Sequence, residues 1–184
     1  MQNKGNWILA GVGVVALYLL MGYFSINSAQ EDIAGRTGNV WNQIDSGAEK
    51  LAQLQSQVLF AYDDRQDLVD TIAASHNDIL AAQEVGDMDA AMAAVGDANI
   101  AIDALAEAMP EYDLTPVQVS LMDETAGTFN RISYARDQLI DAQVSFNKTR
   151  LMWPMFASRV DVLGEGHNPA DTTSIPNQFD NNGE

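Results

Sequence analysis

The chain opens with an unbroken apolar run and continues with a long body in which apolar positions recur at helical spacing. Residues 7–26 read WILAGVGVVALYLLMGYFSI and carry no charge. An α-helix rises about 1.5 Å per residue, so this run covers roughly 30 Å, the thickness of the hydrocarbon core of a bilayer. The pattern predicts a transmembrane helix, followed by a body that is too polar to enter a membrane.

The anchor is expected to be retained and to leave the body outside the cytoplasm. A signal peptide has an apolar run of about 7–15 residues and a small-residue cleavage site, whereas this run is longer and residues 25–29 form a poor site. Lys4 precedes the helix, and Glu31 and Asp32 follow it. The positive-inside rule then predicts a single-pass protein of a bacterial inner membrane, with a cytoplasmic N-terminus and a body on the periplasmic or extracellular side.

The body is predicted to be all-helical. Its five prolines leave residues 29–109 and 117–153 free of this helix breaker. No stretch alternates strictly between apolar and polar residues, as a half-buried strand would. Stripe residues recur every three, four or seven positions in two stretches. The first is Ile33, Val40, Ile44, Leu51, Leu54, Val58, Tyr62, Val69, Ile72, His76 and Ile79, and the second is Met88, Met92, Val95, Ile102, Leu105 and Met109.

Helix boundaries are expected where capping residues occur. The first body helix can continue directly from the anchor, and the pattern allows a break near residues 61–64 without requiring one. Gly86 suits the left-handed position that ends a helix, and Asp87 suits the N-cap of the next. Thr115 and Pro116 form a good N-cap and first-turn pair for the last long helix.

Three glycines interrupt the first body helix, at positions 35, 38 and 47. Each weakens a helix by up to about 1 kcal/mol relative to alanine. They predict either a bend or a place where a neighbouring helix approaches closely.

Two rows of residues recur every seven positions in the last long helix, which is typical of a bundle seam. They are Ile132, Leu139, Phe146 and Trp153, and beside them Leu121, Thr128, Ala135 and Ala142. We therefore predict an all-α fold with an N-terminal transmembrane helix in residues 1–28 and an elongated antiparallel helical bundle in residues 29–163. Residues 164–184 are expected to form an acidic tail that is either flexible or a strap over a neighbouring subunit.

The charge excludes nucleic acid as a partner. Nine Lys and Arg stand against 26 Asp and Glu, a net charge of −17, and nucleic acid requires a cationic surface. The acidity is interpreted as a solvated surface, with an acidic face for cations or for a basic partner as the alternative. The absence of cysteine from the sequence excludes disulfides and thiolate metal sites.

No catalytic, cofactor-binding or metal-binding residue is predicted. His76 lies on an apolar stripe, where a hydrogen-bonded core histidine is the simpler interpretation than a ligand or base. Asp63, Asp64 and Asp67 could bind a hard cation, but they lack the loop spacing of a calcium site. The sequence has no nucleophile elbow, phosphate-binding loop or metal motif, so we expect no enzyme activity and no cofactor.

Two segments resemble the LemA family. Residues 40–45, VWNQID, are similar to the family's "AWsqId" segment. In the last helix the family's "TEnrIaxAR" pattern is matched by Thr128, Asn130, Arg131, Ile132, Ala135 and Arg136. Phe146 and Asn147 then fall on a "YN" pair of the family, and Trp153 and Pro154 fall on the "FP" that ends its helix. The resemblance covers residues 27–160 and departs from the family at Phe129, which replaces an acid, and at Lys50, where an arginine is usual.

The resemblance implies one membrane helix and a helical bundle outside the cytoplasm. In an acidic chain the matched arginines, Arg131 and Arg136, are expected to pair with carboxylates, with Asp45 and Glu124 as candidates. Trp41 and Trp153 are expected to pack near one another or against the end of the bundle.

We expect a non-enzymatic, membrane-anchored helical bundle that acts through protein–protein interaction in the cell envelope. Its expected partners are the bilayer, contacted through residues 7–26, further copies of the chain and other envelope proteins. The alternative is a periplasmic ligand-sensing bundle that signals through a membrane partner. A pilin-like subunit is a third interpretation, but it predicts processing before the apolar helix and a β-rich head.

Overall fold

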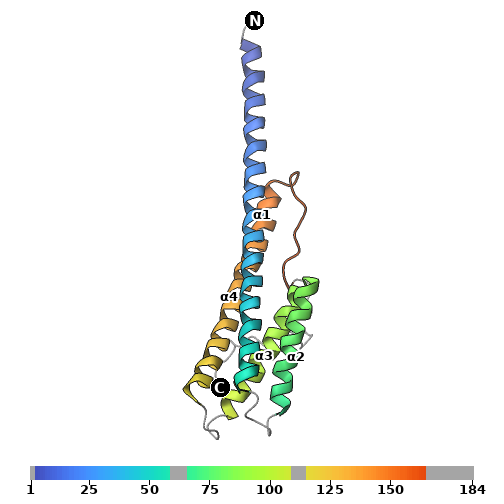
Figure 1. The fold of residues 1–184 in the computed structure, drawn as a ribbon. Helices are drawn as coiled ribbons and strands as arrows, with labels where there is room; N and C mark the ends of the chain where they lie inside the picture. Colours follow the sequence, from blue (N-terminus) through green and yellow to red (C-terminus); the bar gives the residue numbers. More distant parts are fainter. Residues whose placement is uncertain (1–2, 59–65, 109–114, 165–184) are drawn as a thin grey trace, which may run out of the picture. The chain divides into compact units, whose positions relative to one another are not determined.

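The structure is a computed structural model that describes residues 3–58, 66–108 and 115–164. It contains four helices, α1 (Asn3–Val58), α2 (Gln66–Val85), α3 (Met88–Ala108) and α4 (Pro116–Met152) (Figure 1). No strand occurs within these three ranges, so the prediction of an all-α fold is confirmed. The expected break near residues 61–64, Met109 and the tail beyond Gly164 lie outside the described residues.

The helices form two compact units, and α1 and α4 contribute to both. Among the described residues, the anchor unit comprises residues 3–37 and 137–163, and the bundle unit comprises residues 38–58, 66–108, 115–136 and 164. Helix α1 is continuous from Asn3 to Val58, which confirms that the first body helix follows directly from the apolar run.

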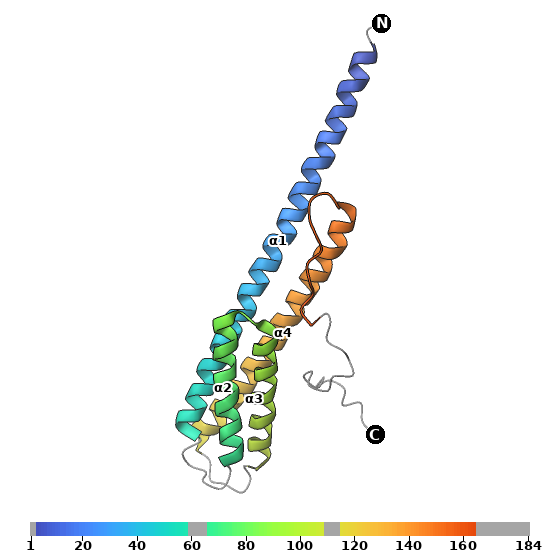
Figure 2. The same cartoon turned by 90° about the vertical axis from the view of Figure 1, so that its right-hand side faces the viewer.

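In the bundle unit, successive helical segments run in alternating directions and enclose one apolar core (Figures 1 and 2). Helices α2 and α3 lie side by side and are joined by a short turn. The predicted stripes supply the buried core: Val40, Ile44, Leu51, Leu54, Ile72, Ile79, Met92, Val95, Ile102, Leu105, Leu121 and Ile132. Burial of these stripes is the main source of helix stability here, because isolated helices are marginal in water.

The turn between α2 and α3 has the capping geometry that the sequence predicts. Gly86 has a φ of +71°, in the left-handed region that glycine adopts without steric cost. The Asp87 amide donates to the Ala82 carbonyl at 2.9 Å, and the Gly86 amide donates to the Gln83 carbonyl at 3.2 Å, which together form a Schellman motif. Asp87 Oδ1 then accepts from the Ala90 amide at 3.0 Å as the N-cap of α3.

Helix α4 begins with a reciprocal cap. The Thr115 hydroxyl accepts from the Gln118 amide at 3.4 Å, while Gln118 Oε1 accepts from the Thr115 amide at 3.0 Å. Pro116 occupies the first helical position, where its missing N–H costs nothing. The predicted start of the last helix is therefore confirmed.

Both heptad rows of α4 face inward. All eight residues are buried: Leu121, Thr128, Ile132, Ala135, Leu139, Ala142, Phe146 and Trp153. Gly47 marks the place where α1 approaches α4 closely in the bundle unit. A Cβ built at Gly47 would lie 3.0 Å from Ile132 Cδ1 and 3.3 Å from Phe129 Cε1. Of the three glycines singled out in the sequence, Gly47 marks close packing, whereas a Cβ at Gly35 or Gly38 would meet nothing within 4 Å.

The anchor unit is built from the first part of α1, the last part of α4 and the segment that follows α4. Its core is Ile26, Phe146 and Trp153, against which Ile33 and Phe156 pack. After Trp153 the chain turns and runs back along α4 (Figure 2). We call this returning segment, residues 153–163, the strap.

The contact at Gly47 makes a stability prediction. We expect Gly47→Leu to lower the free energy of unfolding by about 1–3 kcal/mol, because the added side chain overpacks the seam against Phe129 and Ile132. Thermal unfolding of the full-length chain in detergent, followed by circular dichroism, measures the change.

The matched control is Gly38→Leu, at an exposed position of the same helix. It should leave stability unchanged or raise it by up to about 1 kcal/mol through better helix propensity. Equal effects of the two substitutions would contradict the assignment of Gly47 to a tight seam.

Candidate functional site

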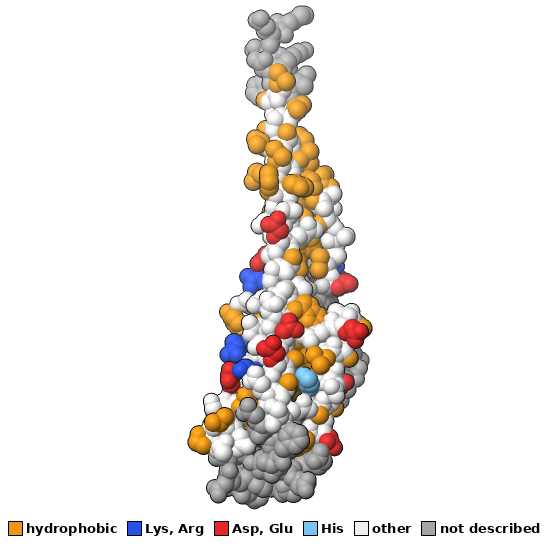
Figure 3. All heavy atoms as spheres, viewed as in Figure 1, with side chains coloured by type: hydrophobic (Ala, Val, Ile, Leu, Met, Phe, Trp, Pro, Cys, Tyr) orange, Lys and Arg blue, Asp and Glu red, His pale blue; other side chains and the backbone are white. Residues whose placement is uncertain are grey.

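The apolar run of α1 is left largely uncovered by the rest of the chain. Helix α1 is the one helix among the described residues that is long and apolar enough to cross a membrane. Figure 3 shows hydrophobic side chains crowded along the N-terminal part of this helix. The exposed large apolar residues are Leu9, Val12, Val14, Val15, Leu17, Tyr18, Leu19, Leu20, Met21, Tyr23 and Phe24.

The end of α4 packs onto one face of this run. A Cβ built on Gly22 would lie 2.6 Å from Trp153 Cε3 and 2.6 Å from Phe156 Cε2, so both rings lie against bare backbone. The Tyr18 ring lies beside the Trp153 ring, with centroids 4.3 Å apart. The Tyr18 hydroxyl donates to the Met152 carbonyl at 3.3 Å. These contacts place the closing Trp-Pro of α4 beside the apolar run of α1.

The strap is held to α4 by side-chain amides. Asn147 Nδ2 donates to the Val160 carbonyl at 2.7 Å, and Asn147 Oδ1 accepts from the Val160 amide at 2.9 Å. Gln143 Oε1 accepts from the Leu163 amide at 2.9 Å. The Asn147 side chain thus satisfies both backbone groups of Val160, the carbonyl and the amide. This motif residue therefore has a structural role, which is to hold the strap on α4.

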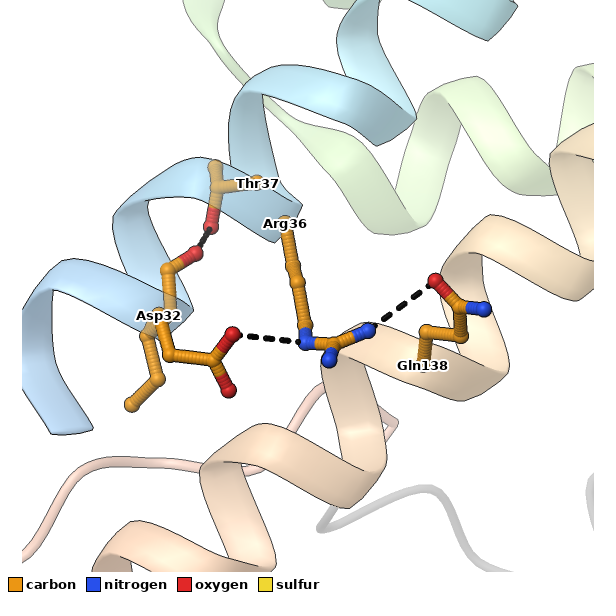
Figure 4. Close-up of polar contacts among 5 residues, drawn as sticks. Asp32, Arg36, Thr37 and Gln138 are labelled. Atoms are coloured by element: carbon orange, nitrogen blue, oxygen red, sulfur yellow. Dashed lines mark hydrogen bonds and ion pairs between the residues drawn. The ribbon is translucent and has the colours of Figure 1, made fainter.

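A second polar contact joins α1 to α4 within the anchor unit. Arg36 Nη1 donates to Gln138 Oε1 at 2.9 Å, while Arg36 Nε pairs with Asp32 Oδ1 at 3.0 Å on its own helix. Figure 4 shows the guanidinium reaching across from α1 between these two partners. The contact is partly solvated, so it fixes the register of the helices more than it adds stability.

The predicted pairing of the motif residue Arg131 with Asp45 or Glu124 is wrong. Glu124 pairs with Lys50 Nζ at 2.8 Å, and Asp45 Oδ1 accepts from Gln83 Nε2 at 2.6 Å. Arg131 Nη2 instead donates to the hydroxyl of Thr128 at 2.6 Å, one turn back on α4. Lys50 on α1 is therefore the cation that pairs with Glu124 on α4.

Trp153 does not pack near Trp41. Its ring contacts Gly22 and Tyr18 on α1, and Trp41 lies about five turns further along that helix. The alternative expectation, that Trp153 packs against the end of the bundle, is also wrong, because its ring packs within the anchor unit.

The weighed metal and histidine sites receive no support from the described side chains. His76 lies half-buried on α2. The described residues contain no group of three His, Asp or Glu side chains placed to hold a metal ion. Asp63 and Asp64 of the aspartate cluster lie outside the described residues, and Asp67 is exposed in the first turn of α2.

Sequence reasoning missed the exposed apolar and basic side chains that lie together at the end of α4. We call residues 148–159 the α4 tip; it comprises the last turn of α4 and the first part of the strap. It contains exposed Leu151, Met152 and Met155 and cations at Lys148, Arg150 and Arg159. The available signal was the absence of Asp and Glu from residues 142–160 of an otherwise acidic chain.

The Asn147 contacts predict how the strap is held. Asn147→Ala removes two hydrogen bonds to Val160, each worth about 0.5–1.5 kcal/mol, so the strap should open more often. Hydrogen exchange on the full-length chain should show about a tenfold or greater loss of protection at the Val160 amide. Thr149→Ala, which removes only a bond to the Ser145 carbonyl within α4, should leave that amide unchanged, and equal loss in both variants would contradict the prediction.

Comparison with known proteins identifies the family. The model of the LemA family matches residues 36–160, more than half of the chain, and this range holds every motif residue placed above. No curated protein and no solved structure matches the chain. The resemblance found in the sequence is confirmed, and the chain belongs to the LemA family.

Proposed function

We propose that this protein is a non-enzymatic, membrane-anchored helical bundle of the cell envelope that works by binding other proteins, first of all copies of itself. The N-terminal part of α1 is the anchor, and the bundle unit is the part that meets other proteins. In this proposal the N-terminus is cytoplasmic and the body lies on the periplasmic or extracellular side of a bacterial inner membrane, as Lys4 before the anchor and Glu31 and Asp32 after it favour.

The observation that carries the proposal is the uncovered apolar surface of α1. Eleven large apolar side chains between Leu9 and Phe24 are exposed. Full burial of one such side chain is worth roughly 1.5–3 kcal/mol, so covering the whole set is worth on the order of 20 kcal/mol. Soluble monomers rarely leave a contiguous apolar surface of this kind open to water. Lipid acyl chains cover it with no further protein needed.

Self-association is favoured by the anchor and by the surface of the bundle unit. Anchoring confines the chains to two dimensions, which raises their effective concentration. Val85 on α2 and Val117 and Tyr134 on α4 are exposed apolar side chains of the bundle unit. The sequence has no nucleophile elbow or phosphate-binding loop, so the proposed role requires no catalytic residue.

Membrane anchoring predicts the effect of charges inside the apolar run. Val14→Arg combined with Leu17→Arg places two charges where insertion costs about 2.5–3.5 kcal/mol each. We expect this variant to leave the membrane fraction on alkaline carbonate washing, while the unmodified chain stays. Ser28→Arg with Gln30→Arg adds the same charge beyond the run and should stay with the membrane. Release of the unmodified chain by the wash would contradict anchoring.

Self-association predicts a mass above that of one chain. Full-length protein extracted in mild detergent should elute as an oligomer in size-exclusion chromatography with light scattering, and it should dissociate on dilution. Chemical cross-linking in native membranes provides the matching measurement before extraction. A monomer at every concentration, together with no cross-linked dimer in membranes, would contradict this part of the proposal.

A further inference from the structure

The α4 tip differs in charge from the rest of the chain. Residues 142–160 contain no Asp or Glu and hold Lys148, Arg150 and Arg159, which are three of the nine Lys and Arg in a chain of net charge −17. This basic stretch packs against the part of α1 that carries no charge at all between Gly5 and Gln30. The anchor unit therefore has a basic end beside an uncharged helix.

The tip is also strongly apolar on its outside. Leu151 is 69% exposed, Met152 68% and Met155 70%. Their neighbour Trp153 is buried against α1, so the three side chains point away from the core of the unit. Exposed apolar groups beside cations and aromatic rings are typical of segments that lie at a membrane interface.

The position of the tip along α1 sets its depth in a bilayer. Residues 7–26 are just long enough to cross about 30 Å of hydrocarbon. Trp153 contacts α1 at Gly22 and Tyr18, which lie roughly 6 and 12 Å inside the end of that run at Ile26. If the tip stayed outside the lipid, only residues 7–17 would remain to span the membrane, roughly half of the required length.

The cations lie nearer the level of Ile26 than the apolar side chains do. Phe146 shares a cluster with Ile26, so Lys148 and Arg150 follow within about one turn along α4. The strap returns to the same level, because Val160 is bonded to Asn147, and Arg159 precedes it. Their long side chains can extend to phosphate groups while their stems lie along apolar surface.

From this arrangement we infer that the α4 tip is a second membrane contact, which docks into the leaflet next to the body. Leu151, Met152 and Met155 enter the acyl region, and Lys148, Arg150 and Arg159 bind the phosphates of anionic phospholipids. The inference rests on the proposed anchoring by residues 7–26. We favour lipid over the soluble body of a second copy as the partner that covers the tip. Trp153 contacts α1 inside the segment that would span the bilayer, so hydrocarbon would surround the tip there.

The test uses the tryptophans of the full-length chain as depth probes. Three variants each keep one tryptophan, Trp7, Trp41 or Trp153, and replace the other two by phenylalanine. Each is reconstituted into bilayers of phosphatidylcholine and phosphatidylglycerol whose acyl chains carry bromine near the headgroup. We expect strong quenching of Trp7 and Trp153 and none of Trp41, which lies about four turns beyond the end of the anchor.

Charge substitutions at matched exposure provide the second arm. In the chain that keeps Trp153, Met152→Glu should abolish most of the quenching, because a carboxylate is repelled by anionic lipid and excluded from hydrocarbon. Val117→Glu, at an equally exposed position at the other end of α4, should leave it unchanged. Removing Lys148 as Lys148→Gln should weaken the preference of the tip for phosphatidylglycerol by about fivefold.

The outcomes separate this inference from the proposed function. If Trp7 is quenched and neither Trp153 nor Trp41 is, docking of the tip is overturned and the proposed anchor stands. No quenching of Trp7 overturns the anchor itself. Quenching of Trp153 that Met152→Glu leaves unchanged overturns the entry of the apolar side chains into the acyl region. Quenching that is equally strong without phosphatidylglycerol and with Lys148→Gln overturns the assigned phosphate contacts.

Discussion

The packing of the Trp153 ring on the bare backbone of Gly22 is the contact on which the anchor unit depends. Because position 22 has no side chain, the ring reaches the helix itself, and Phe156 closes over the same spot. Trp153 is also the last member of the heptad row that begins at Ile132, so this row ends in contact with the apolar run of α1. Any larger residue at position 22 would move the end of α4 away from the uncharged helix.

The helical framework could be predicted from the sequence because its signals are local. Heptad rows, the Gly86–Asp87 turn and the Thr115–Pro116 cap each depend on residues within a few positions of one another, and the structure places all of them as predicted. The close seam at Gly47 was one of two interpretations left open. The sequence could not choose between them, because the partner side chains come from α4, more than eighty residues away.

The candidate site was less predictable because its contacts join distant segments. Proximity within a motif suggested that arginines would pair with Asp45 and Glu124, but side chains pair by helix face and register. Glu124 therefore meets Lys50, and Arg131 meets its own helical neighbour Thr128. The role of Asn147 was hidden for the same reason, since a strap beyond a Trp-Pro pair carries no periodic signal. The acid-free composition of residues 142–160 was visible in the sequence, but its meaning depends on the contact with α1.

Helix α1 continues without a break through residues 26–37. A hinge in this segment would need a break, such as a proline or an irregular turn, and this part of the helix has none. The hydrogen bond from Arg36 to Gln138 attaches this part of α1 to α4 at a second point. In the proposed role α1 spans a bilayer, and a change in bilayer thickness makes a spanning helix tilt. The end of α4 packs on α1 within the same unit, so it would tilt together with the helix and change its depth in the lipid.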